Sequence, residues 1–499
     1  MTNAARTLAA WAAKFEPNDA DLTLADRALR DTVAVASAAR EHPVRHLFDE
    51  LSDAGRWAAL AHVLDFDDLH LPSTTHVSAV CVPAALTGGG GAPARVGDPR
   101  GGGGAPARVG DPQHGGDAPA HLGDPQDGGD AAAGGGGPRV GGDEPTGGGD
   151  SRASTADGGE RAANARAYLA GAGVMTRLGT ALGWKHYTAG WHATCTAGAP
   201  AAAVAAAFAR GLDAERIETA IALSIPGAGG VQRAFGTAAK SLQVGFAVEA
   251  GVRAASLAEK GATADPTALD QWLELVGGEA EAIEVDGPAV PGGLAIKLYP
   301  CCYALQRPIA AAVEVRARAA VEVRARAAGA GQWAIASEEV RAIRVTTPTS
   351  SLKPLIHNAP TTGLEGKFSM QYGIAAALLD GHPDLQSFTD DAVQRPEAQR
   401  LMELVELTPT PGGDGLLDGE VEFEITLKGG DQVTGRLRLP PGAPDRPPTD
   451  DELGHKLDAC AGSRADEIKA LTWDTAREAL RRWATAPAQT AGAVWSPRD

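Results

Sequence analysis

A Gly- and Pro-rich stretch over residues 87–160 interrupts the chain and constrains its fold most. The block GGGGAPARVGDPR at residues 88–100 returns at residues 101–113 and, more loosely, at residues 114–126. Each unit carries a single Val or Leu, so stacked units cannot bury a core. Because closure entropy grows slowly with loop length, a fold can carry such a segment. We therefore predict a disordered insertion between two helices, with the core built from the rest of the chain.

Composition limits the class of protein. The chain has 499 residues, too many for one core, which favours two domains. A net charge of −18 argues against non-specific nucleic-acid binding but leaves room for a small anionic substrate at a locally basic site. The five cysteines lack ligand spacing, which predicts neither a zinc site nor disulfides. No signal peptide or apolar run of membrane-spanning length is evident, so we expect a cytoplasmic protein with no membrane partner.

Hydrophobic periodicity predicts a mainly α fold with two parts. Residues 1–265 are expected to form a large all-helical domain, interrupted by the insertion. Residues 266–440 are expected to form a smaller α+β lid domain, and residues 441–499 helices that return to the first domain. The predicted strands are 294–299, 339–346, 421–427 and 432–439, with a hairpin at 428–431. AVEVRARA occurs twice, at residues 312–319 and 320–327, which one helix could absorb; we assign the duplication no function.

An acidic cluster lies within residues 61–83. Asp65, Asp67 and Asp68 fall within four residues, and His70 and His76 follow, with apolar residues on both sides. One interpretation is a solvated helix end, because charge clusters are common there. The other is an acid/base or ligand-orienting site, because burying such a cluster requires compensating partners.

Other candidates are weak one by one. His186 and His192 precede an Ala-rich helix, where an imidazole tends to stay neutral, although a satisfied histidine is equally ordinary. Lys240 opens a helix, and Lys297 sits in an apolar run, where it either faces an anion or extends to solvent. Tyr372 lies on an apolar helix, where a core role is the default. Together these side chains suit holding a polycarboxylate and moving a proton alpha to a carboxylate.

Six segments resemble the successive signatures of the MmgE/PrpD family. They are LDFDDLHLPSTTH (64–76), GWHATCTAGAPAAA (190–203), FGTAAKSLQVGFAVEAG (235–251), IKLYPCC (296–302), KFSMQYGIAAALLDG (367–381) and DELGHKLDACAG (451–462). The family includes 2-methylcitrate dehydratase, cis-aconitate decarboxylase and iminodisuccinate epimerase. The resemblance implies a helical domain, an α+β lid, an active site between them, a homodimer, and chemistry without a metal, an iron–sulfur cluster or another cofactor.

The resemblance also implies site residues. It gives Asp65, His76, His192 and Tyr372 as catalytic residues, and Lys240 and Lys297 as the lysines that bind substrate carboxylates. We take His76, oriented by Asp65, as the group that transfers the proton, with His192 or Tyr372 on the opposite side; the assignment among the three stays open.

Several positions depart from the family pattern. Leu69 stands where Thr is common, Val77 where Pro is usual, Gln243 where His closes Lys-Pro-Leu-His, and Gln306 where His is frequent. They put the substrate in doubt more than the reaction class, and DFDD favours the cis-aconitate decarboxylase side. We expect a cofactor-independent lyase, a dehydratase or decarboxylase, of a small di- or tricarboxylate. The alternatives are an isomerase or epimerase, a Mg²⁺ site at the acidic cluster, and a non-catalytic binding protein.

Overall fold

The computed structural model describes residues 3–89, 152–326 and 337–484. Most of the predicted insertion lies outside these residues. At its borders, α4 (Ser78–Gly88) extends to Gly88 and α5 (Arg152–Thr188) begins at Arg152, so helical structure reaches into both ends of the range predicted to be disordered. The described residues up to Gly89 and from Ala156 onward belong to one compact unit.

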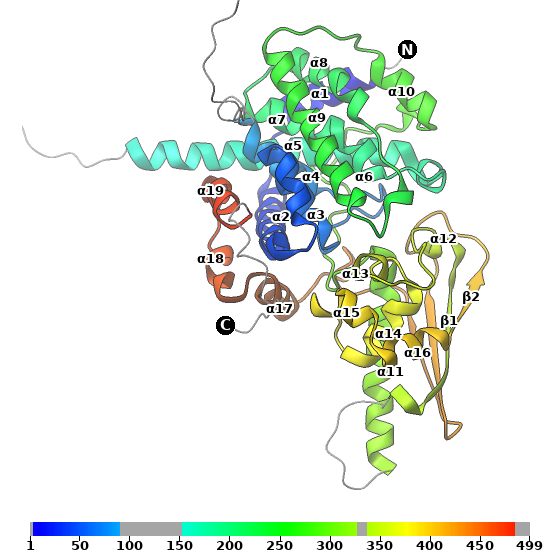
Figure 1. The fold of residues 1–499 in the computed structure, drawn as a ribbon. Coiled ribbons are helices and arrows are strands. Elements are labelled where there is room, and N and C mark those ends of the chain that lie inside the picture. The colour runs from blue at the N-terminus through cyan, green and yellow to red at the C-terminus, as the bar shows by residue number, and fades with distance from the viewer. Residues whose placement is uncertain (1–2, 90–151, 327–336, 485–499) are drawn as a thin grey trace, which may run out of the picture. The chain divides into compact units, whose positions relative to one another are not determined.

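Helices build the first hydrophobic core (Figure 1). In chain order they are α1 (Ala4–Lys14), α2 (Asp19–Ala38), α3 (Asp53–Val63), α4, α5, α6 (Ala193–Thr196), α7 (Gly198–Ala209), α8 (Ala214–Ser224), α9 (Ala239–Glu259) and α10 (Ala268–Val276). Helix α9 packs against α3, α7 and α8. Gly251 of α9 allows the close approach of α9 to α7, because a Cβ at this position would lie 2.5 Å from the carbonyl oxygen of Ala199 in α7.

A four-stranded mixed sheet anchors the second core. Its order is β2 (Val405–Thr410), β1 (Val340–Pro348), β3 (Val421–Leu427) and β4 (Gln432–Leu437). β1 pairs parallel with β2 and antiparallel with β3, and β3 pairs antiparallel with β4. Burial alternates along β3, as expected for a strand with one face on a core. That core is covered by α11 (Tyr303–Arg326), which packs on β3 and β4, and by α14 (Met370–Asp380), which packs on α11.

Shorter helices complete this part of the chain. They are α12 (Thr349–Leu352), α13 (Gly363–Gly366), α15 (Asp390–Val393) and α16 (Pro396–Glu403). The AVEVRARA duplication falls in α11, whose described part ends at Arg326.

Two strand predictions were wrong. Residues 294–299 form no strand: a single antiparallel bridge joins Ala295 to Leu69, and the segment runs alongside the acidic cluster. Strand β2 was not predicted, because Pro409 within VELTPT argues against a strand interior. The structure accommodates this proline by placing β2 at the edge of the sheet.

The last three helices pack against the first core. They are α17 (Asp450–Ala461), α18 (Ala465–Lys469) and α19 (Trp473–Ala484), and all three contact α2. A mainly α fold with a small sheet is therefore confirmed, whereas the domain borders and the lid stay predictions. Among the described residues, no helix combines the length and apolarity needed to cross a bilayer.

Candidate active site

The acidic cluster is buried, so its interpretation as a solvated helix end was wrong. Asp65, Asp67 and Asp68 are 2%, 1% and 0% exposed. Helix α3 ends at Val63, and the chain then turns through Asp65, whose φ of 52° lies in the left-handed region. Aspartate tolerates this conformation better than most residues, but it persists only where the surroundings hold it.

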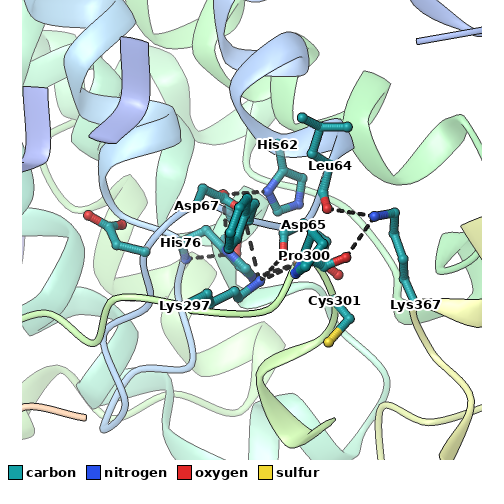
Figure 2. A network of polar contacts seen from close by, with 12 residues as sticks. His62, Leu64, Asp65, Asp67, His76, Lys297, Pro300, Cys301 and Lys367 are labelled. Carbon is teal, nitrogen blue, oxygen red and sulfur yellow. Dashed lines mark hydrogen bonds and ion pairs between the residues drawn. The ribbon is translucent and has the colours of Figure 1, made fainter. Parts of the chain in front are cut away.

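Three buried lysines hold this turn. Each ammonium group donates to one of three successive carbonyl oxygens: Lys367 to Leu64 at 2.8 Å, Lys297 to Asp65 at 3.0 Å and Lys456 to Phe66 at 2.8 Å. Figure 2 shows the first two of these contacts. Lys367 also donates to the carbonyl of Pro300 at 2.7 Å, which ties the turn to the segment carrying Lys297. Burial lowers the pKa of Lys367 to about 8.

The Asp65 carboxylate is paired with two lysines. Its Oδ1 lies 2.5 Å from Lys297 Nζ and 3.4 Å from Lys240 Nζ. Burial opposes ionisation of Asp65, but the attraction of Lys240 and Lys297 outweighs it and holds the pKa of this carboxyl well below its usual range. Burial alone would lower the pKa of Lys297, yet Asp65 and Asp67 raise it. For Lys240 burial prevails, and its pKa is lowered.

Asp67 lies between two histidines. Its Oδ2 accepts a hydrogen bond from His62 Nδ1 at 2.7 Å and lies 3.0 Å from His76 Nδ1, a contact that does not meet hydrogen-bonding geometry. The other nitrogen of His62 lies 2.7 Å from Lys240 Nζ, and that of His76 lies 4.0 Å from Asp65 Oδ1. Burial lowers the pKa of His76 to about 3, even though Asp67 opposes the shift. His76 is therefore a neutral imidazole at physiological pH.

His192 lies beside this group on a separate element. It is 2% exposed, it precedes the short helix α6, and its ring stacks on that of His62 at 5.6 Å between centroids. Its Nδ1 is 2.6 Å from Gln243 Nε2 and 3.2 Å from Cys195 Sγ. Burial, with the positive charge of nearby groups, holds the pKa of His192 well below its usual value.

These groups surround a small cavity. Polar lining comes from Asp65, Thr74, His76, His192 and Lys240, and apolar and weakly polar lining from Leu69, Tyr187, Phe235, Cys302, Tyr303, Phe368 and Leu416. The cavity has a volume of about 20 Å³, which holds about one water molecule. A substrate carboxylate is larger than one water molecule, so it can enter the cavity only if the lining side chains move apart.

Asp68 faces away from the cavity. Its carboxyl accepts hydrogen bonds from the backbone amide and the hydroxyl of Ser78, at the start of α4. Burial raises the pKa of Asp68 to about 7, although both bonds from Ser78 oppose the shift. Its contacts indicate a role in holding α4 against the turn.

Five of the six predicted site residues meet here: Asp65, His76, His192, Lys240 and Lys297. Tyr372 does not. Its hydroxyl donates to the carbonyl of Ser387 and its ring packs edge-on against Phe388, within the second core. The catalytic role expected for Tyr372 is therefore not supported, because its only polar atom faces a different segment.

Sequence reasoning missed two members of the site, His62 and Lys367. His62 sits in the last turn of α3 among apolar residues, so the pattern reads as a core-facing helix. Its place five residues before Asp67 was the available signal. Lys367 opens KFSMQYG, and nothing in its neighbourhood indicates burial.

One departure from the family pattern, Gln306, has a structural role, and so does the residue that follows it, Arg307. Gln306 accepts from the amides of Leu298 and Tyr299 and donates to the Tyr299 carbonyl, so it holds the loop after Lys297. Arg307 donates to the Ser351 hydroxyl and to the carbonyls of Leu417, Asp418, Gly419 and Arg438. Neither lines the cavity. Leu69, in contrast, does.

His62, Asp67 and His76 could together hold a metal ion, since one ligand atom of each lies within 4.8 Å of the others. Their surroundings disfavour a cation, because Lys240 Nζ contacts His62 and Lys297 Nζ lies 3.9 Å from Asp67 Oδ1. The Mg²⁺ alternative also needed His70, but both ring nitrogens of His70 are engaged, by Ser73 Oγ and the Pro291 carbonyl.

Comparison with known proteins places these residues in context. The MmgE/PrpD N-terminal domain matches residues 153–273 and the MmgE/PrpD C-terminal domain matches residues 299–482. The chain is similar to a cis-aconitate decarboxylase of Aspergillus terreus, 28% identical over 304 residues that cover 56% of this chain and 60% of that protein. It is also similar to the cis-aconitate decarboxylase of Homo sapiens, 26% identical over 302 residues, 58% of this chain and 59% of that protein. The match thus spans about 60% of the length of these relatives.

Proposed function

The chain belongs to the MmgE/PrpD family, and we propose that it is a lyase that dehydrates or decarboxylates a small di- or tricarboxylate, with proton transfer at the carbon alpha to a carboxylate. The observation that carries the proposal is the meeting of Lys240, Lys297 and His76 around Asp65, of which Asp65, His76 and Lys240 line one cavity and Lys297 lies behind Asp65. Decarboxylation is favoured over dehydration by the two similar proteins described above, both cis-aconitate decarboxylases.

The charge balance suits an acidic substrate. Three buried ammonium groups, of Lys240, Lys297 and Lys367, face two ionised carboxylates, of Asp65 and Asp67, which leaves one positive charge uncompensated. A substrate carboxylate that displaces Asp65 from Lys240, the longer of the two pairs, would form charge-assisted hydrogen bonds in its place. The same ammonium groups would stabilise negative charge that develops on an enolate-like intermediate.

Proton transfer falls to His76. Its neutral ring can accept a proton, and Asp65 and Asp67 lie on either side to stabilise the imidazolium that forms. In dehydration this proton comes from the alpha carbon while hydroxide leaves. In decarboxylation His76 first takes a proton from water; the carbon–carbon bond then breaks, CO2 leaves, and the carbanion receives that proton from the imidazolium, which returns to its neutral form. Tyr372 has no part in this proposal.

A panel of di- and tricarboxylates, followed by NMR in D2O, tests the function. We expect loss of CO2 or water from at least one compound. His76→Ala and Lys240→Ala should abolish turnover with the fold retained by circular dichroism. Exposed residues supply matched controls, His46→Ala for the imidazole and Lys260→Ala at the end of α9 for the ammonium group. Near-normal turnover in both site variants would refute the proposal.

The second candidate, an isomerase or epimerase, uses the same proton abstraction without a leaving group. It is favoured by the placement of histidines on two elements, α3 with its following turn and the segment before α6, from which two sides of one carbon could be reached. Deuterium exchange with inversion, and without loss of CO2 or water, would select it. A complete lack of turnover across the panel would favour a non-catalytic binding protein. A homodimer is proposed from the family resemblance alone, and size-exclusion chromatography with light scattering tests it.

A further inference from the structure

The two cavity histidines have different partners at the same ring atom. His76 Nδ1 faces a carboxylate, Asp67 Oδ2 at 3.0 Å, whereas His192 Nδ1 faces an amide nitrogen, Gln243 Nε2 at 2.6 Å. A neutral imidazole carries one hydrogen, and the hydrogen bond at one nitrogen decides where that hydrogen sits. The partners therefore fix which nitrogen of each ring is free to accept a proton.

The orientation of the Gln243 amide follows from its other contact. Gln243 Oε1 lies 3.0 Å from the backbone nitrogen of Val231, which can only donate, so this atom must be the amide oxygen. The amide NH2 then faces His192, and two N–H groups cannot face each other at this distance. His192 Nδ1 must accept, and the ring hydrogen sits on Nε2. The thiol of Cys195, 3.2 Å from Nδ1, is likewise able to donate to it.

The partner of His76, Asp67, places the hydrogen of that ring on the other nitrogen, Nδ1. Asp67 is ionised: the pKa of its carboxyl lies well below the usual value, the Nδ1 hydrogen of His62 is donated to its Oδ2, and Lys297 Nζ lies 3.9 Å from its Oδ1. A carboxylate only accepts, so His62 donates its Nδ1 hydrogen to Asp67 Oδ2, and a hydrogen on His76 Nδ1, 3.0 Å from the same oxygen, is favoured over a lone pair there by the negative charge. The lone pair of His76 is then on Nε2, on the side of Asp65.

We propose that Gln243 and Asp67 hold His192 and His76 in opposite tautomers, which makes His76 the only proton acceptor of the pair and His192 a neutral hydrogen-bond donor. Gln243 is a positioning residue, which acts through His192. This assignment rests on the proposed function for its chemical meaning, but the tautomers themselves are properties of the protein without substrate. It resolves the choice left open between these two histidines: His192 has no free lone pair with which to accept a proton.

A neutral imidazole N–H suits the stabilisation of charge on an oxygen without proton transfer. His192 Nε2–H would donate to a substrate carboxylate or enolate oxygen, and the proton from carbon would go to His76 Nε2. No imidazolate forms at His192, since its hydrogen stays on the ring.

The test uses the full-length protein labelled with ¹⁵N at the histidine rings and long-range ¹H–¹⁵N correlation NMR, which distinguishes protonated from unprotonated ring nitrogens. His192→Gln and His76→Gln identify the two signal sets. We expect Nε2–H for His192 and Nδ1–H for His76 in the unmodified chain. Gln243→Glu, of the same size, replaces the donor by an acceptor and should move the hydrogen of His192 to Nδ1. Gln399→Glu, an exposed glutamine whose amide donates to the Val393 carbonyl, is the matched control and should leave both signal sets unchanged.

An Nδ1–H tautomer for His192 in the unmodified chain would overturn the proposal, and so would an unchanged tautomer in Gln243→Glu. Should that variant fail to fold, the unmodified chain still decides. On a substrate that the panel identifies, Gln243→Glu should lower kcat roughly a hundredfold, as expected when one preorganised donor is lost, with a smaller change in KM. Lack of turnover by the unmodified chain would remove the proposed function yet leave the tautomer assignment standing.

Discussion

Lys367→Met offers a stability test that depends on pH. Lys367 is 2% exposed and donates hydrogen bonds to the carbonyls of Leu64 and Pro300, and no carboxylate of the described residues forms an ion pair with it. Methionine has similar length and removes both the charge and the two donors. The variant therefore separates the effect of burying an ammonium group from the effect of its hydrogen bonds.

The magnitude follows from the pKa. Burial lowers the pKa of Lys367 from 10.5 to about 8, and at about 1.4 kcal/mol per unit this is about 3 kcal/mol of unfavourable charge burial at neutral pH. Between pH 8 and 10.5 the unfolded chain binds more protons than the folded one, so this contribution to the free energy of unfolding rises with pH. The neutral amine keeps its two hydrogen bonds, each worth about 1 kcal/mol.

We therefore expect Lys367→Met to be about 1 kcal/mol more stable than the unmodified chain at pH 7 and about 1–2 kcal/mol less stable than it at pH 10. Urea unfolding of both proteins at the two pH values measures the difference, and Lys353→Met, at an exposed lysine, is the control. Equal destabilisation at pH 7 and pH 10 would refute the assignment of Lys367 as a buried ammonium group with a depressed pKa. Looser positioning of Asp65 should also lower kcat/KM.

Three further predictions follow from the same geometry. The acidic limb of kcat/KM should lie well below pH 6.5, because the pKa of His76 is lowered to about 3. The alkaline limb should lie below pH 10.5, because burial lowers the pKa of Lys240 and a neutral amine binds carboxylates weakly. A pH–rate profile with an acidic limb at pH 6.5 would contradict the first of these expectations. Tyr372→Phe should lose about 1 kcal/mol of stability, through one buried hydrogen bond, and leave kcat unchanged; a large fall in kcat with normal stability would restore its catalytic role. Lys456→Met should lose about 3–5 kcal/mol in urea unfolding, because it leaves Asp31, 2.6 Å from Lys456 Nζ, buried without its partner; Lys469→Met, at an exposed pair, should change little.

The helices of the first core could be predicted because their apolar residues recur at helical spacing. Lys240 was predicted to open a helix, and α9 (Ala239–Glu259) begins one residue before it. The strands of the sheet were harder to predict. Residues 294–299 are apolar apart from Lys297, as in a buried strand, yet they bridge to Leu69 at one position only, because their neighbours are the acidic turn and α11 instead of a sheet.

The site could be predicted only where a residue type stands out from its surroundings. Three aspartates in an apolar stretch and a lysine in an apolar run, Lys297, are such signals. His62 and Lys367 carry none, because their roles come from contacts with residues distant along the chain. Tyr372 shows a different limit: the resemblance predicts a catalytic tyrosine at this position, but the direction of its hydroxyl, toward the Ser387 carbonyl, depends on packing around Phe388.

The lysines that hold the turn at residues 64–66 have a consequence for biosynthesis. A ribosome delivers this turn early, whereas Lys297, Lys367 and Lys456 emerge much later. Until then the nascent chain carries an unneutralised acidic loop that cannot adopt its left-handed bend. The turn can therefore gain its full set of lysine contacts only after α17, which carries Lys456, has been synthesised.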